Sequence, residues 1–122
     1  MTIVCVDDHP IMLRGLSHTI RELVPDADVA AFENGNGALG YVRENGCDIL
    51  ISEIELCGIS GLTLAQEIKQ MNPRVNIIFL TVCDEREHAR EVLRIKPSGY
   101  LVKPVEQDQL ESELKNLRYH AS

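Results

Sequence analysis

Short hydrophobic runs recur along the chain, between longer segments whose hydrophobic residues are spaced as in a helix. Four runs are rich in Val and Ile and stop at polar or turn-forming residues, which is typical of buried β-strands. A fifth, weaker run between an acidic pair and an Asn/Gly loop indicates an edge strand. The five predicted strands are Ile3–Val6, Val29–Phe32, Ile49–Ile54, Val75–Val82 and Tyr100–Val102.

Capping and helix-breaking residues between these strands predict where the helices begin and end. The first helix is expected to have Asp8 as its N-cap and Pro10 in its first turn. The second is expected to end at Asn45–Gly46 and the third at Asn72–Pro73, because the residue before a proline disfavours helical geometry. The highly charged segment Glu85–Ile95 predicts a weakly anchored fourth helix.

Each predicted helix has a hydrophobic face that should contact the core. In the fifth helix, Glu113 is expected on the outer face, opposite Lys and Arg. The fourth helix has only Ala89, Val92, Leu93 and Ile95 as hydrophobic residues. The core-facing residues expected in the other helices are Ile11, Leu13, Leu16, Ile20 and Leu23 in the first, Ala38, Leu39 and Val42 in the second, Leu62, Leu64, Ala65, Ile68 and Met71 in the third, and Leu110, Leu114 and Leu117 in the fifth.

Five strands that alternate with five helices predict a parallel sheet with helices on both faces. Right-handed crossovers make this an α/β, flavodoxin-like, doubly wound (βα)5 fold. The chain has 122 residues and no Pro-, Gly- or Ser-rich linker, so one domain is expected over residues 1–122.

Charge and hydropathy exclude several classes of partner. The net charge is -7 and the pI is near 5, which disfavours direct nucleic-acid binding by this domain. The first hydrophobic run, Thr2–Val6, is too short for a signal-peptide core or a membrane span. We therefore expect a soluble, cytoplasmic protein that contacts neither nucleic acid nor membrane directly.

The cysteines have neither the spacing of a zinc site nor that of a disulfide framework. Cys5, Cys47, Cys57 and Cys83 are therefore predicted to be reduced thiols. Cys57 and Cys83 follow neighbouring strands, close to His9, so a thiol switch or a soft-metal site is a less favoured alternative.

Polar residues follow four of the predicted strands. Asp7 and Asp8 follow the first strand, Glu53 lies in the third, Thr81 ends the fourth and Lys103 follows the fifth. Because ligands of open parallel sheets bind at the carboxyl ends of the strands, we expect these residues to form one shallow site. Carboxylates suit a hard cation such as Mg²⁺, and lysine and threonine suit phosphoryl oxygens. Singly, each residue could instead be a helix cap or a solvated charge; jointly, they favour a site.

Four segments have a distinctive order and spacing: Val4–Pro10, Cys47–Glu53 with Gly58 and Gly61 after it, Phe79–Thr81, and Ser98–Pro104. Together they resemble the receiver domain of two-component response regulators over essentially the whole chain. The resemblance implies a signalling role and no enzymatic one. It also implies Mg²⁺ binding by Asp7, Asp8, the position of Glu53 and the backbone carbonyl of Glu55, phosphoryl contacts from Thr81 and Lys103, a switch role for Tyr100 together with Thr81, and a cis bond between Lys103 and Pro104.

The chain departs from the family at the centre of this site. Glu53 stands where the family has its phosphoaccepting aspartate, and Leu56–Cys57 replace a Met-Pro pair. Glutamate is one methylene longer, and misplacement by about 1 Å costs on the order of a hundredfold in rate. Phosphorylation is therefore expected to be slow or absent, and Mg²⁺ binding weakened. Asp48 precedes the third strand, at the opposite end of the sheet, and is not expected to substitute.

The state that Glu53 produces is left open by the sequence. Its charge either imitates the phosphorylated state at Lys103 and Thr81, or pairs with Lys103 and locks the domain off. Two other functions remain as alternatives: an ordinary receiver that a histidine kinase phosphorylates, and, less favoured, a small Mg²⁺-dependent phosphoryl-transfer enzyme with Asp7 as nucleophile.

The resemblance also predicts partners. A protein partner or a second copy of the chain is expected to bind the face formed by the fourth helix, the fifth strand and the fifth helix. A DNA-binding effector domain, if the natural protein has one, lies outside this chain, and its output would be transcriptional.

Overall fold

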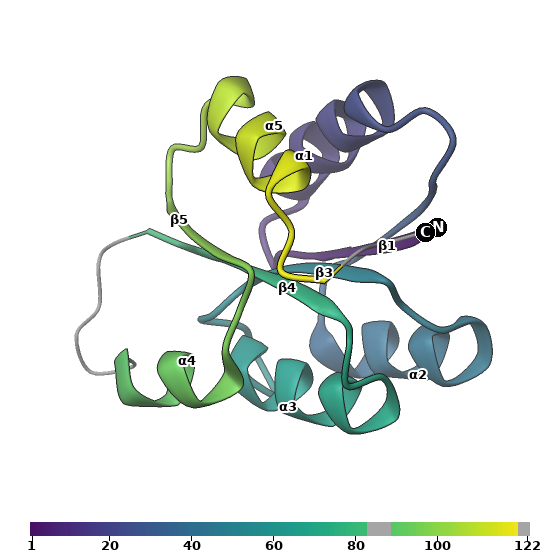
Figure 1. The fold of residues 1–122 in the computed structure, drawn as a ribbon, viewed down its shortest axis with the longest axis vertical. Helices are drawn as coiled ribbons and strands as arrows, with labels where there is room; N and C mark the ends of the chain where they lie inside the picture. The colour runs from purple at the N-terminus through teal and green to yellow at the C-terminus, as the bar shows by residue number, and fades with distance from the viewer. Residues whose placement is uncertain (83–88, 120–122) are drawn as a thin grey trace.

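The structure is a computed structural model that describes residues 1–82 and 89–119. Five parallel strands form one sheet in the order β2-β1-β3-β4-β5, which is a flavodoxin-like, doubly wound order (Figure 1). The predicted fold class is confirmed, and so is the edge position of β2. The elements are β1 (Thr2–Val6), α1 (Pro10–Leu23), β2 (Asp28–Phe32), α2 (Gly35–Asn45), β3 (Ile49–Glu53), α3 (Gly61–Met71), β4 (Asn76–Thr81), α4 (Ala89–Ile95), β5 (Gly99–Val102) and α5 (Gln107–Lys115).

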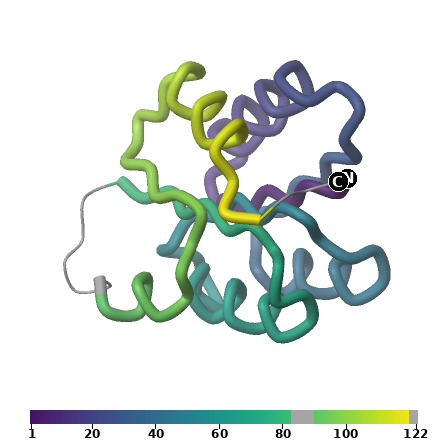
Figure 2. The backbone as a smooth tube through the Cα atoms, in the orientation of Figure 1, coloured from purple at the N-terminus to yellow at the C-terminus, as the bar shows by residue number. Residues whose placement is uncertain are grey.

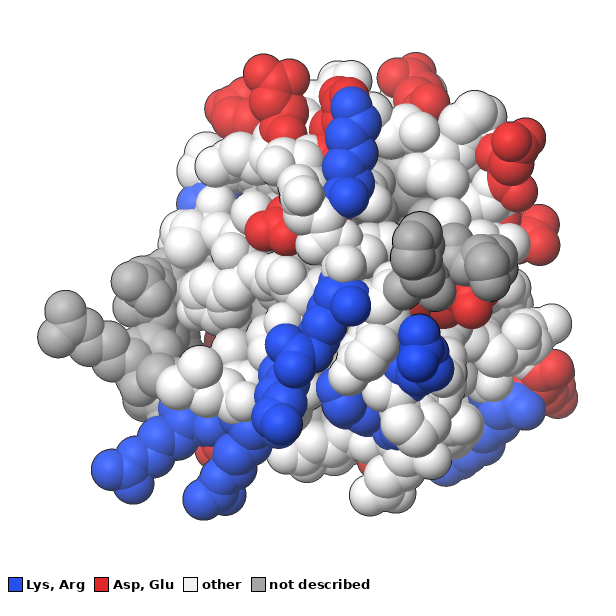
Figure 3. All heavy atoms as spheres, in the orientation of Figure 1, with Lys and Arg blue, Asp and Glu red and all other residues white. Residues whose placement is uncertain are grey.

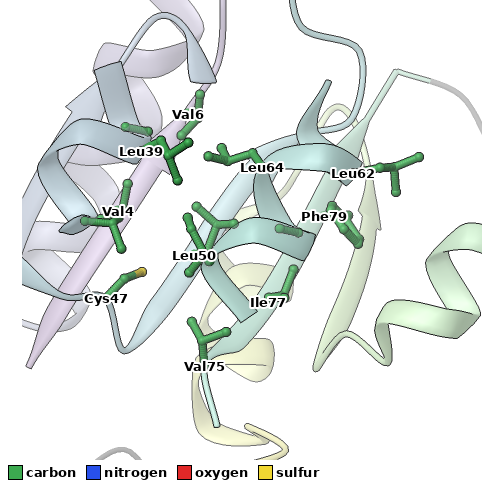
Figure 4. Close-up of a cluster of buried hydrophobic side chains, with 14 of the residues drawn as sticks. Val4, Val6, Leu39, Cys47, Leu50, Leu62, Leu64, Val75, Ile77 and Phe79 are labelled. Atoms are coloured by element: carbon green, nitrogen blue, oxygen red, sulfur yellow. The ribbon is translucent and has the colours of Figure 1, made fainter. Parts of the chain in front are cut away.

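Helices cover both faces of the sheet, with α1 and α5 on one side and α2, α3 and α4 on the other (Figure 1 and Figure 2). Successive side chains of a strand point to opposite faces, so each strand contributes to two cores. In β1, Val4 and Val6 belong to the core that contacts α2 and α3, while Ile3 and Cys5 belong to the other core. Figure 4 shows the first of these cores. Burial on both faces explains why the strands are nearly continuous hydrophobic runs.

The helix ends agree with the prediction where a local residue determines them. The side chain of Asn34 accepts a hydrogen bond from the backbone N–H of Gly37 at 2.8 Å and caps α2. Gly46 ends this helix with a φ of 78°, a left-handed conformation that glycine adopts without a steric penalty. α3 ends at Met71 with Asn72 as its C-cap, which agrees with the end predicted from the proline that follows.

Three predictions about the first and third helices are wrong. The N-cap of α1 is His9 rather than Asp8, and no side chain caps this helix. Ile11 is 86% exposed, because it lies two positions before the buried Leu13 and therefore about 200° away around the helix. Met71, the last residue of α3, is 44% exposed, because helical spacing does not show where the sheet beneath a helix ends.

The fourth helix is shorter in the described residues than predicted. It comprises Ala89–Ile95, and residues 85–88 of the predicted segment lie outside the described residues. Val92 and Ile95 pack against the core, whereas Leu93 is 74% exposed. Its hydrophobic contact with the sheet is therefore narrow, as predicted.

The prediction for Glu113 is also wrong. This side chain is half-buried, and its carboxylate would lie 2.3 Å from a Cβ atom placed on Gly99, so it faces β5. The missing side chain of Gly99 leaves the space that Glu113 occupies. Leu117 lies beyond the end of α5 but still packs against the core.

The cysteines of the described residues are free, as predicted. Cys5 and Cys47 are buried, and burial raises the pKa of each thiol to about 12. Cys57 is exposed, and Cys83 lies outside the described residues. In the part of the chain that the structure describes, we find no helix with the length and hydropathy that crossing a bilayer requires.

Candidate functional site

The carboxyl ends of four strands bring the predicted site residues to one edge of the sheet. β1 leads directly into Asp7, β3 ends with Glu53, β4 ends with Thr81, and Lys103 follows β5. The backbone N–H of Lys103 donates to the carbonyl of Thr81 at 2.7 Å, which continues the pairing of β4 with β5. The strand ends therefore hold these side chains in place.

Lys103 is the centre of a buried charge cluster. Its Nζ lies 2.5 Å from Asp7 Oδ2 and 2.7 Å from Glu53 Oε2. The exposed fractions of the three side chains are 7% for Lys103, 1% for Asp7 and 2% for Glu53. Lys103 donates a hydrogen bond to Asp7, whereas Glu53 Oε2 is a close ion-pair partner that receives no well-directed hydrogen bond from the described residues.

The cluster shifts the pKa of two of its members. Burial alone would raise the pKa of Asp7, but hydrogen bonds from Lys103 and His9 outweigh it and hold the pKa below its ordinary value. Burial alone would lower the pKa of Lys103, but its hydrogen bond to Asp7 and its attraction to the carboxylates of Asp7 and Glu53 outweigh this effect and raise the pKa. Both groups are charged at neutral pH, so their attraction stabilises the folded state.

The cluster predicts how stability depends on pH. The pKa of Asp7 is lowered on folding, so its stabilisation is present above the unfolded pKa and is lost as the pH falls through the folded pKa. The pKa of Lys103 is raised, so its stabilisation is present below the unfolded pKa and is lost as the pH rises through the folded pKa. Both contributions are complete between roughly pH 5 and pH 9. We expect Asp7→Asn to reduce the loss of stability between about pH 5 and pH 2, measured by urea unfolding.

The matched control for this prediction is Asp26→Asn, which changes an exposed carboxylate before β2. It should leave the acid dependence close to that of the wild type. Equal acid dependence in the wild type and in Asp7→Asn would contradict the proposed contribution of Asp7.

A second group of side chains borders the cluster. Asp7, Asp8 and His9 each offer one ligand atom, and these atoms lie within 4.8 Å of one another. Asp8 Oδ1 is buried and has no hydrogen-bond donor among the described residues. A buried carboxylate oxygen without a donor is a suitable ligand for a hard divalent cation, so the residues present fit the Mg²⁺ that the resemblance implies.

The other predicted residues have the expected positions in the fold. Thr81 is fully buried at the end of β4, and Tyr100 is partly buried against the core that contacts α2 and α3. Glu55 is exposed, and its backbone N–H lies 3.5 Å from Glu53 Oε1. The bond between Lys103 and Pro104 is cis, as expected. Asp48 accepts a hydrogen bond from the backbone of Thr2, at the start of β1, so it is remote from the site as predicted.

Two features of the site were missed from the sequence. His9 was considered only beside the cysteines, in a less favoured thiol switch or soft-metal site, but its Nδ1 lies 3.1 Å from an oxygen of each of Asp7 and Asp8. Gly61 was only part of a motif, but a Cβ there would lie 2.1 Å from the carbonyl oxygen of Glu53. The only sign of the His9 contacts in the sequence was that His9 directly follows the acidic pair. The close approach of Gly61 to Glu53 depends on how two chain segments pack, so the sequence could not show it.

Comparison with known proteins gives the family. Residues 3–115 match the model of the response regulator receiver domain. The chain belongs to this family. Proteins of this family are signalling proteins, so the match agrees with the predicted signalling role.

Related receiver-containing proteins are longer than this chain. The transcriptional regulatory protein DegU of Brevibacillus brevis is 28% identical over 114 residues, which are 93% of this chain and 48% of that protein. The transcriptional activator protein ExaE of Pseudomonas putida is 32% identical over 103 residues, or 84% of this chain and 48% of that protein. The receiver domain described here thus spans about half the length of these two relatives.

Solved structures confirm the fold. The chemotaxis protein CheY4 of Vibrio cholerae has a TM-score of 0.83 at 22% identity, over 93% of this chain and 95% of that one. A receiver domain protein of Clostridium thermocellum has a TM-score of 0.84 at 23% identity, over 94% and 91% of the two chains.

Proposed function

We propose that this receiver domain is a regulatory interaction module whose output does not require phosphorylation of Glu53. The observation that carries the proposal is the buried pair in which Glu53 Oε2 lies 2.7 Å from Lys103 Nζ. In the family, the lysine at this position contacts the phosphoryl group. Here its ammonium group already faces two carboxylates, those of Glu53 and Asp7.

The pair opposes phosphorylation in two ways. A phosphoryl oxygen would have to displace Glu53 from Lys103, and a buried carboxylate that loses its partner is strongly destabilised. Glu53 would also be the acceptor, and its additional methylene moves the carboxylate out of the position that a shorter aspartate would hold. The proposed resting state of the site is therefore an internal ion pair.

The same pair weakens the proposed Mg²⁺ site. The ion would be held by Asp7 and Asp8, with Glu53 and the backbone carbonyl of Glu55 completing the set. When bound, it would supply neutralising charge to phosphoryl oxygens. Asp7 Oδ2 and Glu53 Oε2 already face the ammonium group of Lys103, so less negative charge remains to attract a cation.

We further infer that the output passes through protein contacts and that the domain does no enzymatic turnover. DegU and ExaE have names that assign them to transcription, and about half of each lies outside the match, so an attached effector domain is the proposed route to transcription.

The exposed hydrophobic side chains of Leu93 in α4 and Val102 in β5 support a docking face on α4, β5 and α5. On the side that Figure 3 shows, acidic side chains predominate over the α1 and α5 half and basic ones over the α3 and α4 half.

The test is incubation with Mg²⁺ and acetyl phosphate, followed by intact-mass measurement. We expect no phosphoryl adduct on the wild type and an adduct on Glu53→Asp, because the shorter carboxylate withdraws from Lys103. The matched control is Glu44→Asp, the same change at an exposed position of α2, which should behave as the wild type.

Two outcomes would contradict the proposal. An adduct on Glu53 of the wild type would mean that the domain is an ordinary receiver, of the kind that a histidine kinase phosphorylates. A folded Glu53→Asp variant without an adduct would show that the length of the side chain is not the obstacle.

A further inference from the structure

Tyr119 is held at the end of the sheet opposite Glu53. Asn76, the first residue of β4, is 1% exposed, and its side-chain amide forms two hydrogen bonds with the backbone of Tyr119. Its Nδ2 donates to the carbonyl of Tyr119 at 2.9 Å, and its Oδ1 accepts from the N–H of Tyr119 at 2.8 Å. Ser98 Oγ also donates to Asn76 Oδ1 at 2.8 Å. These bonds fix the backbone of Tyr119, so its partly exposed ring has a defined place on the surface.

Three cations from different parts of the chain surround this ring. Lys69 Nζ of α3 lies 5.6 Å from the ring centroid, and Arg74 Cζ, from the loop between α3 and β4, lies 5.5 Å from it. Arg118 Cζ, from the segment after α5, lies 5.9 Å from it. Lys69 also donates to the carbonyl of Ile95 at 2.8 Å, which ties the group to the end of α4. Tyr119 and these three cations form the Tyr119 cluster.

The cations of the cluster lack a counter-charge. Within residues 1–82 and 89–119, none of the three is paired with a carboxylate. Residues 66–76 and 89–98 contain five Lys or Arg and two Glu, although the whole chain has a net charge of -7. Basic side chains accordingly gather over the α3 and α4 half in Figure 3. The three cations lie within about 12 Å of one another, a distance close to the Debye length of about 8 Å, so they repel one another and an anion would relieve the repulsion.

The pKa of Tyr119 responds to the same charges. It is held below its ordinary value, mainly by the side-chain hydrogen bond with Arg118 and also by the charges of Lys69, Arg118 and Lys96. These cations therefore favour negative charge at the ring hydroxyl.

The chemistry of the cluster favours the carboxylates of a protein over the phosphates of a nucleic acid. Guanidinium groups, such as those of Arg74 and Arg118, bind planar carboxylates through paired hydrogen bonds. Tyrosine and arginine are enriched among the residues that dominate binding energy in protein interfaces. A nucleic acid would bring phosphates along its whole length toward a chain of net charge -7, whereas a short acidic segment can place its charge on these cations alone.

We propose that the Tyr119 cluster is a docking site for an acidic segment of a protein partner. The carboxylates of the segment would pair with the three cations, and the fixed ring would hold these cations in place. The site lies near the start of β4, so it is separate from the buried charge cluster at the carboxyl ends of the strands. The inference goes beyond the proposed function and does not rest on the state of Glu53.

The experiment is a fluorescence titration of an acidic peptide with the purified chain. The probe is a peptide of eight glutamates with one terminal tryptophan, and the chain has no tryptophan, so the anisotropy of tryptophan fluorescence comes from the peptide. Combining Arg74→Gln with Arg118→Gln should weaken binding about tenfold or more, because two charge-assisted pairs are lost. Raising the NaCl concentration from about 20 mM to about 150 mM should weaken binding to the wild type severalfold.

The matched control combines Arg14→Gln with Arg43→Gln, which changes two exposed arginines of α1 and α2. It alters the net charge by the same amount away from the cluster, so binding should stay within about twofold of the wild type. Tyr119→Leu keeps all three cations but removes the ring that they contact, so it should weaken binding severalfold. Circular dichroism should show that all these variants are folded.

Three results would overturn the inference: no binding of the peptide at about 20 mM NaCl, equal weakening in the cluster variant and in the control, or displacement of the peptide by an equal concentration of an eight-nucleotide single-stranded DNA. The last result would assign the cluster to nucleic acid. The titration uses neither a phosphodonor nor a change at Glu53. Its failure would therefore leave the mass measurements on Glu53→Asp unchanged, and an adduct on wild-type Glu53 would leave the titration unchanged.

Discussion

Replacement of Lys103 by Met is expected to lower the free energy of unfolding by about 3–5 kcal/mol at neutral pH. The variant keeps a side chain of similar length but removes the ammonium group that Asp7 and Glu53 share. Two buried carboxylates, both of which lie within 2.7 Å of the same nitrogen, would then face each other without a counter-charge. Urea unfolding of the wild type and the variant measures the difference.

A matched control and a rescue variant distinguish the buried pair from a general effect of losing a lysine. Lys115→Met removes a lysine that is 72% exposed and pairs with Glu111 at 2.9 Å, so it should leave the free energy of unfolding close to that of the wild type. Adding Glu53→Gln to the Lys103→Met variant should restore part of the lost stability, because only one charged carboxylate then remains. Equal losses in the two lysine variants, or no rescue, would contradict this account of the cluster.

Replacement of Gly61 by Ala is expected to destabilise the domain by about 3 kcal/mol or more. The new Cβ would lie 2.1 Å from the carbonyl oxygen of Glu53 and 3.0 Å from the Cα of Ile54. These are backbone atoms that a rotamer change cannot move. The backbone N–H of Gly61 also donates to the carbonyl of Ile54 at 2.9 Å, so the two segments are held together. Thermal or urea unfolding measures the loss.

Gly40→Ala is the matched control, because it makes the same chemical change within α2. A Cβ at Gly40 would have no atom within 4 Å, and alanine favours the helix, so this variant should be stabilised by about 0.5–1 kcal/mol. The two substitutions are therefore expected to have opposite signs. A Gly61→Ala variant as stable as the wild type would show that α3 can move away from β3 at little cost.

The strands and helices could be predicted because their determinants are local. The hydrophobic run Ile49–Ile54 predicted a strand, and the helix-breaking pair Asn45–Gly46 predicted the end of a helix. Both predictions are close to the observed elements. The errors have a physical cause as well. Ile11 is hydrophobic and has helical spacing, yet it is exposed, because hydrophobicity does not determine which side of α1 contacts the sheet. Glu113 is charged, yet it faces β5 because Gly99 leaves room for it.

The candidate site was predictable in its membership and not in its contacts. The rule that ligands bind at the carboxyl ends of parallel strands was sufficient to group Asp7, Glu53, Thr81 and Lys103. It could not show that Lys103 bonds to Asp7, 96 residues away, as well as pairing with Glu53. That contact depends on how strands from distant parts of the chain lie side by side.

The sequence by itself determined the fold class, the family and the presence of a glutamate at position 53, because periodicity, motif order and residue identity are properties of the chain alone. Only the tertiary structure decided that this glutamate is buried beside Lys103 and that Gly61 lies against its backbone. It also decided that His9 and Cys57 both approach Asp8. Distances of a few ångströms between groups far apart in sequence arise only when the sheet and its connections are assembled, and electrostatic and steric energies depend on those distances.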